Sequence, residues 1–338
     1  MKIQGLFMDD LYMWSTRAGL SFRQYVFPPY DKDLDVTKFR PVYWLAAWIE
    51  QGFLGRHVNL IIPFNICVAA AIAWGIYFFA KTLAKNRGIA FGLSFLFLAS
   101  RFSYYNIGQF LGLMEAMGLG FLLLTFLYLY RYLARENSRW DIYLAVFFFV
   151  LNCFTHERYV VFLPMFLFVL LAKKSRDLAA YGTVVLSFSF VLGVRYFFLR
   201  SFMPAGTGGT NLADTFTLKE CIKSVGMEIL YLLGINTGPE HLCGIPFSQS
   251  ALGIRFLILA GNFFLLLYLI KYAFTIVSNP KIRNWSHFRI LLLFAGFIGG
   301  TIVSSSVTVR VEVRWIYAPY MLFLLLLAFI YGVMAEAG

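Results

Sequence analysis

The sequence predicts an all-α, polytopic membrane protein, from its composition and from nine apolar segments separated by loops whose charge alternates. Of the 338 residues, 60% are hydrophobic, 19% are aromatic and only 14% are charged, with a mean hydropathy of +0.72. A soluble domain carries far more charge. Apolar runs of about 20 residues are typical of membrane-spanning helices, whereas a barrel would show shorter, alternating segments.

The apolar segments predict a bundle of about nine transmembrane helices. The three shortest segments are expected to be tilted, broken or re-entrant, because a straight span needs about 20 residues; they are 88–100, 141–154 and 158–172. The remaining segments are 57–80, 107–130, 178–199, 251–272, 290–308 and 316–335.

The loops between these segments are alternately basic and poor in basic residues. Under the positive-inside rule the basic loops are cytoplasmic, which places the C-terminus inside and residues 1–56 outside. The same loops explain the net charge of +12 without a nucleic-acid partner. We therefore predict a multi-pass protein of the plasma (inner) membrane, with an active site on its external face. The basic residues of the four cytoplasmic loops are Lys81, Lys85 and Arg87; Arg131, Arg135 and Arg139; Lys173, Lys174 and Arg176; and Lys271, Lys281, Arg283 and Arg289.

One integral membrane domain is expected, built from four stretches of chain. These are an external loop over 1–56, a first transmembrane block over 57–199, an external loop over 200–250 and a C-terminal transmembrane block over 251–338. The first loop is rich in aromatic residues that suit an amphipathic structure at the headgroup level. Residues 221–233 are a candidate for a helix resting on the membrane. Because the first loop holds seven basic residues and no apolar span precedes it, an upstream first helix is expected to be missing.

An adjacent acidic pair, Asp9 and Asp10, lies in the first external loop, and three interpretations of it stay open. One carboxylate could act as a general base toward an acceptor hydroxyl. The pair could join Asp31, Asp33 and Asp35 as ligands of a divalent metal ion, which is the one cofactor the sequence suggests. The third interpretation is a helix N-cap at the membrane surface.

Arg40 and a second charged cluster, residues 155–158, are predicted on the same face as this pair. Arg40 precedes Pro41, which favours an extended backbone, and its guanidinium suits either a lipid phosphate or a snorkelling position. His156, Glu157 and Arg158 stand between two apolar runs, where ionisable residues are functional candidates. Glu157 could instead pair with Arg158 or with an arginine of another cluster, and His156 could cap a helix end.

A third cluster, Arg310, Glu312 and Arg314, opens the last apolar run. On an extended segment the three side chains would share one side, and on a helix Arg310 and Arg314 would share a face. Either arrangement brings two guanidinium groups together, as a departing phosphate requires. The alternative is a simple external anchor.

Glu115 lies inside the apolar run 107–130, where a lone carboxylate is costly. It is expected either to line a polar cavity with Asn106 and Gln109 or to make a polar contact between helices. The four cysteines have no metal-ligand spacing, and the two in the second external loop could pair or remain free thiols. They are Cys67, Cys153, Cys221 and Cys243.

Short motifs follow one another along nearly the whole chain: Asp9-Asp10, Phe39–Trp44, His57–Asn65, Gly112–Glu115, His156–Arg158 with Pro164, and Glu312–Pro319. Their order resembles the GT-C superfamily of membrane glycosyltransferases, nearest to bacterial relatives of the protein O-mannosyltransferases and of the aminoarabinose and TMTC-type transferases. The family often has Lys-Glu where this chain has His156-Glu157. The resemblance implies a GT-C-like bundle whose external loops bind a polyprenyl-phosphate-linked sugar and an acceptor. It aligns Asp9 with the general base and Asp10 with a supporting acid.

The predicted function is therefore an inverting glycosyltransferase that moves a sugar from a polyprenyl phosphate to an acceptor hydroxyl on a glycan, lipid or protein. The alternative is a transporter or flippase of a lipid-linked saccharide, which should show internal repeats and charges through the depth of the bundle. A non-catalytic scaffold subunit would not need the acidic pair. The residues predicted to bind the donor phosphate are Arg40, His156, Glu157, Arg158, Arg310, Glu312 and Arg314.

Overall fold

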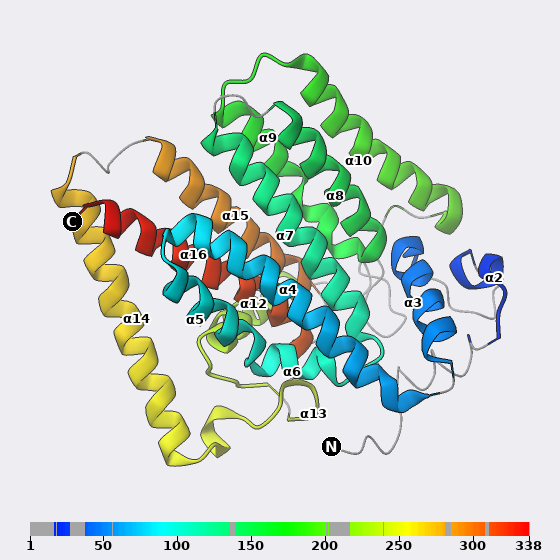
Figure 1. Ribbon diagram of the computed structural model, residues 1–338, viewed down its shortest axis with the longest axis horizontal. Helices are drawn as coiled ribbons and strands as arrows, with labels where there is room; N and C mark the ends of the chain where they lie inside the picture. The colour runs from blue at the N-terminus through cyan, green and yellow to red at the C-terminus, as the bar shows by residue number, and fades with distance from the viewer. Residues whose placement is uncertain are drawn as a thin grey trace. The chain divides into compact units, whose positions relative to one another are not determined.

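The computed structural model contains helices and no strand among the residues it describes (Figure 1). Among the described residues, six helical segments are long and apolar enough to cross a membrane, so the chain is an α-helical polytopic membrane protein, as predicted. The described residues are 17, 19–27, 38–55, 57–135, 139–200, 202, 217–238, 240–280, 285–307 and 311–337. The six segments are α4 (Ile61–Ala84), α7 (Gly112–Ala134), α10 (Leu178–Leu199), α14 (Leu252–Ser278), α15 (Trp285–Ser306) and η5 (Val313–Ile316) continued by α16 (Tyr317–Ala337).

The other three predicted apolar segments form shorter helices, and they are the three that were expected to be irregular. They are α5 (Arg87–Leu98), α8 (Arg139–Thr155) and α9 (Leu163–Ala172), with 12, 17 and 10 residues. At 1.5 Å per residue they are about 18, 26 and 15 Å long, against a hydrocarbon core of about 30 Å. Each predicted apolar segment thus corresponds to a helix, while a count of nine full spans stays a prediction.

The chain divides into two compact units, each built from two stretches of sequence. The first unit comprises residues up to Gly75 and Leu98–Asp214, and the second comprises Ile76–Phe97 and Thr215–Gly338. The division cuts through α4, so its first part belongs to the first unit and its last part, with α5, to the second.

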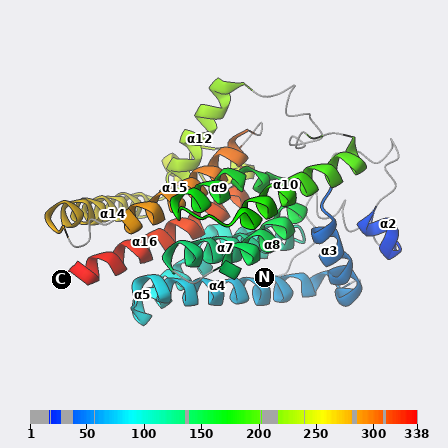
Figure 2. The same ribbon diagram turned by 90° about the horizontal axis from the view of Figure 1, so that it is seen from above.

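In the first unit, α7 and α8 lie side by side, as both Figure 1 and Figure 2 show. On α8 pack α10 and α3 (Pro41–Leu54), while α9 packs on α7 and α10. Two short helices complete the unit, with α6 (Arg101–Ile107) on α7 and α2 (Phe22–Val26) on α3. The core is aromatic: Phe126, Phe149 and Phe166 are fully buried, and the rings of the last two lie 4.9 Å apart.

The second unit is organised around α16, which contacts α14 and α15. Its core holds the tilted ring pair Phe294–Phe329 and the stacked pair Phe97–Tyr317. A Cβ at Gly332 would stand 2.1 Å from the carbonyl oxygen of Leu83, so a glycine is required where α16 meets the end of α4. No residue in the most apolar stretch of α14 is buried, which suits a lipid-facing helix.

The predicted second external loop is largely helical where it is described. It contains α12 (Leu218–Leu232), α13 (Glu240–Cys243) and η4 (Phe247–Gln249), so the helix expected over 221–233 is confirmed while its place on the membrane stays a prediction. All four cysteines are free, and the alternative in which Cys221 pairs with Cys243 is therefore wrong. The buried Cys243 thiol instead donates to the carbonyl oxygen of Val311, 3.1 Å away.

Candidate functional site

A break between α8 and α9 positions the charged triplet of the first unit. Helix α8 ends at Thr155, and His156 is extended, with φ −151° and ψ 122°. His156 caps the 3₁₀ helix η2 (Glu157–Phe162), because its Nδ1 accepts a hydrogen bond of 3.4 Å from the backbone N–H of Arg158. The prediction that His156 caps a helix end is thus confirmed. Pro164 then lies in the first turn of α9, where a missing N–H costs nothing.

Glu157 pairs with Arg40, which was predicted separately from the clusters, and not with its neighbour Arg158. The Arg40 guanidinium donates through Nε to Oε2, at 2.7 Å, and through Nη2 to Oε1, at 2.8 Å. Arg40 stands just before α3, with φ −131° and ψ 58°, since Pro41 at the first position of the helix keeps it out of the helical region. The side chains of Arg40 and Glu157 are only 11% and 7% exposed, so this two-pronged pair is largely removed from water.

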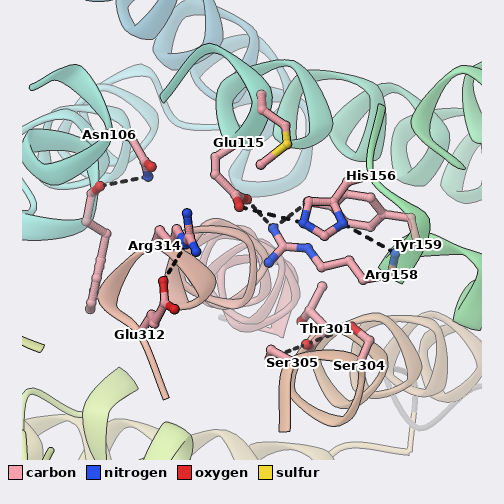
Figure 3. Close-up of polar contacts among 12 residues, drawn as sticks. Asn106, Glu115, His156, Arg158, Tyr159, Thr301, Ser304, Ser305, Glu312 and Arg314 are labelled. Carbon is pink, nitrogen blue, oxygen red and sulfur yellow. Dashed lines mark hydrogen bonds and ion pairs between the residues drawn. The ribbon is translucent and has the colours of Figure 1, made fainter. Parts of the chain in front are cut away.

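Arg158 pairs with a different carboxylate, that of Glu115 in the first turn of α7 (Figure 3). Its Nη2 donates to the Glu115 carboxylate and, at 3.1 Å, to the Tyr159 hydroxyl. Glu115 therefore makes the contact between helical segments that was one of its two predicted roles. Asn106, expected to share a cavity with it, donates instead to the carbonyl oxygen of Phe102 within its own helix.

The His156 imidazole lies between the two carboxylates. Its Nε2 is 4.0 Å from Glu115 Oε1, and its Nδ1 is 3.8 Å from Glu157 Oε2. Nε2 is also 3.5 Å from Arg40 Nη2. One ring thus connects both ion pairs, and a proton gained or lost by this ring changes the charge felt by each pair.

Arg195 is a member of this group that sequence reasoning missed. It lies near the end of α10, is only 5% exposed, and interacts electrostatically with Glu157 and Arg40. The available signal was an arginine inside the apolar run 178–199, since charged residues in membrane helices are rare and usually functional.

These side chains form what we call the Arg/Glu cluster: Arg40, Glu115, His156, Glu157, Arg158 and Arg195. Among the described groups, three arginines face two glutamates, which leaves one positive charge with a neutral imidazole and two with a protonated one. Burial by itself raises the pKa of the Glu157 carboxyl, but the Arg40 guanidinium and the His156 ring outweigh burial and hold this pKa well below its ordinary value. Glu157 and Glu115 thus each hold an arginine in an ion pair within the cluster.

Close packing against α7 fixes the cluster in place. A Cβ at Gly118 would lie 2.9 Å from the ring of Tyr159, and one at Gly112 would lie 1.7 Å from the carbonyl oxygen of Asn106. Only glycine allows these approaches. The Arg158 guanidinium in turn lies over the Tyr159 ring, with its Cζ atom 5.0 Å from the ring centroid.

The described part of the third predicted cluster, in the second unit, is a local ion pair (Figure 3). Glu312 is extended and caps η5, and its carboxylate lies 2.5 Å from Arg314 Nε. Arg310 lies outside the described residues, so the predicted convergence of two guanidinium groups stays a prediction. Arg314 is committed at least in part to the acid beside it.

The acidic pair Asp9-Asp10 lies outside the described residues, as do the acidic residues 31, 33 and 35 that were proposed as metal ligands. Within the part of the chain that is described, no group of three or more His, Cys, Asp or Glu side chains could hold a metal ion. Of the predicted site residues, the structure therefore brings together Arg40, His156, Glu157 and Arg158.

Comparison of the chain with models of protein families, with curated proteins and with solved structures gave no match.

Proposed function

We propose that this protein is a membrane-embedded glycosyltransferase that uses a polyprenyl-phosphate-linked sugar, and that the Arg/Glu cluster binds the donor phosphate. The observation that carries the proposal is a buried cluster of three arginines, two glutamates and a histidine in a polytopic membrane protein. Buried charges of this kind are expensive and usually serve function. The bundle would be GT-C-like, with the three shorter helices completing about nine membrane passages.

The cluster offers donors that could turn to a phosphate without breaking both ion pairs. Arg40 uses Nε and Nη2 for Glu157, whereas its Nη1 lies 2.9 Å from the sulfur of Met114, a weak acceptor. A phosphate oxygen would be a stronger acceptor for that N–H. Arg195 supplies a further guanidinium, and His156 could donate a proton or a hydrogen bond.

The reaction is a single displacement. Asp9, supported by Asp10, takes the proton of the acceptor hydroxyl, and the acceptor oxygen attacks the anomeric carbon from the face opposite the phosphate. The bond from that carbon to the phosphate oxygen breaks, and polyprenyl phosphate leaves with its added negative charge stabilised by arginine donors. The configuration at the anomeric carbon is inverted.

The chemical test is an assay of the purified protein against a panel of polyprenyl-phosphate sugars. Asp9→Asn should fold, bind donor and lose about 10²–10⁴ in turnover, because an amide cannot accept the proton. Asp10→Asn should lose less. Arg40→Gln should weaken donor binding, while Asp177→Asn, remote from the cluster along α10, serves as the matched control. Full activity of the Asp9→Asn, Asp10→Asn double variant would contradict the mechanism.

The same preparation distinguishes the alternative of a transporter or flippase. In proteoliposomes, a carrier would move the lipid-linked saccharide across the bilayer with no new glycosidic bond, and this movement would survive both aspartate substitutions. The external position is tested by cysteine labelling in intact cells. An Arg131→Cys thiol should be protected from an impermeant reagent added outside.

A further inference from the structure

The ends of α7 and α9 and the starts of α8 and α10 form a basic surface of the first unit, which we call the basic end. It lies at the opposite termini of the same helices that carry the Arg/Glu cluster. Its six basic residues and three acidic ones give the two stretches, 131–141 and 173–177, a net charge of +3. The basic residues are Arg131, Arg135, Arg139, Lys173, Lys174 and Arg176, and the acidic ones are Glu136, which lies outside the described residues, Asp141 and Asp177.

Hydrogen bonds hold the two stretches together, so the basic end is one built surface. The Lys173 ammonium donates to the carbonyl oxygens of Tyr132 and Arg135, at 2.5 and 2.7 Å, and thereby satisfies the end of α7. The Tyr132 hydroxyl donates to Ser175 Oγ at 3.1 Å. These contacts join the α7–α8 and α9–α10 connections.

The two described acids of this surface are already engaged. Asp141 forms an ion pair with Arg131, whose Nη2 is 3.3 Å from Oδ1. Asp177 accepts a hydrogen bond from Arg139, at 2.9 Å, and also caps the start of α10. Arg135, Lys174 and Arg176, which belong to neither of these two pairs, are exposed.

The turn between α9 and α10 holds Lys174 in place. Its backbone is in the left-handed region, with φ +53°, as are those of Lys85 and Arg200 at the ends of α4 and α10. The N–H of Ser175 closes this turn on the carbonyl oxygen of Leu170, 3.0 Å away.

Two exposed apolar side chains set the level of this surface in the membrane. Trp140 is 77% exposed at the start of α8, and Leu178 is 82% exposed at the start of α10. Tryptophan is enriched at the boundary between hydrocarbon and headgroups. The basic side chains beside it are therefore suited to contact lipid headgroups.

We infer that the basic end binds the headgroups of anionic phospholipids. A layer of headgroups with a net negative charge complements the +3 surface, and each basic residue near such a layer strengthens binding by about fivefold. This inference does not depend on the proposed transferase activity, since it concerns other residues at the other termini of the helices.

The test uses the purified full chain in detergent, where insertion topology has no influence. Phosphatidylglycerol or phosphatidylcholine is titrated in mixed micelles, and the thermal unfolding midpoint and the lipid retained in native mass spectrometry are recorded. Phosphatidylglycerol should raise the midpoint and be retained, whereas phosphatidylcholine and soluble glycerol phosphate should do neither. The triple variant Arg135→Gln, Lys174→Gln, Arg176→Gln should bind phosphatidylglycerol at least tenfold more weakly.

A matched triple variant removes three exposed lysines of the second unit, by Lys219→Gln, Lys223→Gln and Lys271→Gln. It should retain phosphatidylglycerol as the parent does. Equal retention by the parent and the basic-end variant would overturn the inference. Equal loss in both variants, or an equal effect of soluble glycerol phosphate, would also overturn it, because binding would then reflect overall charge or a free anion.

Discussion

The two termini of the helices α7 to α10 both carry two arginine–carboxylate pairs, and the pairs differ in burial. At the Arg/Glu cluster, the side chains of Arg40, Glu157, Arg158 and Glu115 are at most 11% exposed. At the basic end, the arginines Arg131 and Arg139 are 35% and 72% exposed, while their partners Asp141 and Asp177 are 7% and 22% exposed.

This difference separates two reasons for placing charge in a membrane protein. Exposed pairs are weakened by water and salt, so the basic end can carry surplus charge at little cost. A buried pair must overcome the loss of hydration of both ions, and apolar side chains would often stabilise the fold equally well. A buried cluster with a third arginine and a histidine is therefore better explained by function than by stability.

The largest expected effect comes from removing one partner of a buried pair. Glu157→Gln keeps the shape of the side chain but leaves the Arg40 guanidinium without its counter-charge, and it should lower the free energy of unfolding by about 3–5 kcal/mol. Asp177→Asn at the basic end keeps a side chain that can cap α10, so this change should alter the free energy of unfolding little. If denaturant titrations showed the same loss of unfolding free energy for both variants, the pairs at the two termini would not differ in their contribution to stability.

The same carboxylate should show itself in acid. Because its pKa is depressed in the fold, Glu157 contributes its full stabilisation above the ordinary glutamate pKa of about 4.3, and this contribution is lost as the pH falls through the lower, folded value. Thermal midpoints measured between neutral pH and about pH 3 should therefore fall more steeply for the parent than for Glu157→Gln. If the thermal midpoints of the parent and of Glu157→Gln fell in parallel as the pH was lowered, the pKa of Glu157 would not be depressed in the fold.

Replacing both partners of the second buried pair should distinguish stability from function. Arg158→Met alone should be strongly destabilising, because it leaves Glu115 buried and charged. Arg158→Met with Glu115→Leu should bring the free energy of unfolding back to within about 2 kcal/mol of the parent, as apolar replacements of buried pairs do elsewhere. Donor binding should remain lost. A double variant as unstable as the single one would assign the pair a structural role.

A smaller effect is expected from crowding the cluster through α7. Gly118→Ala places a methyl group against the Tyr159 ring and should cost about 1–3 kcal/mol. Gly120 is the matched control in the same helix, because nothing lies within 4 Å of a Cβ there. Gly120→Ala should be neutral or slightly stabilising, and the order of the two thermal midpoints decides the prediction.

The smallest effect is expected at the exposed pair of the basic end. Arg139→Gln should shift the thermal midpoint less than any change above, because water surrounds most of this guanidinium. The shift should shrink further as salt is raised. A large loss that persists in high salt would place Arg139 in a structural network like that of the Arg/Glu cluster.

Predictions from the sequence succeeded where a single segment determines the outcome. The apolar run 178–199 became α10 with the same bounds, and the three segments predicted to be irregular became the three short helices. His156 was identified as a helix-capping candidate from its place between two apolar runs. In the predicted second external loop, the helix expected over 221–233 corresponds to α12, whereas the short helices α13 and η4 were not anticipated.

The sequence by itself determined the membrane class, the helices and the basic loops, because lipid acts on each segment separately and requires each to satisfy its own backbone hydrogen bonds. Only the tertiary structure decided which charges meet. Arg40 and Glu157 are 117 positions apart, and nothing in either local sequence favours this pairing over Glu157 with Arg158. Arg195 joins them because α10 packs on α8, and Glu115 meets Arg158 because α7 does. Helix packing brings distant side chains within a few ångströms, and Coulomb attraction at low dielectric then selects the partners.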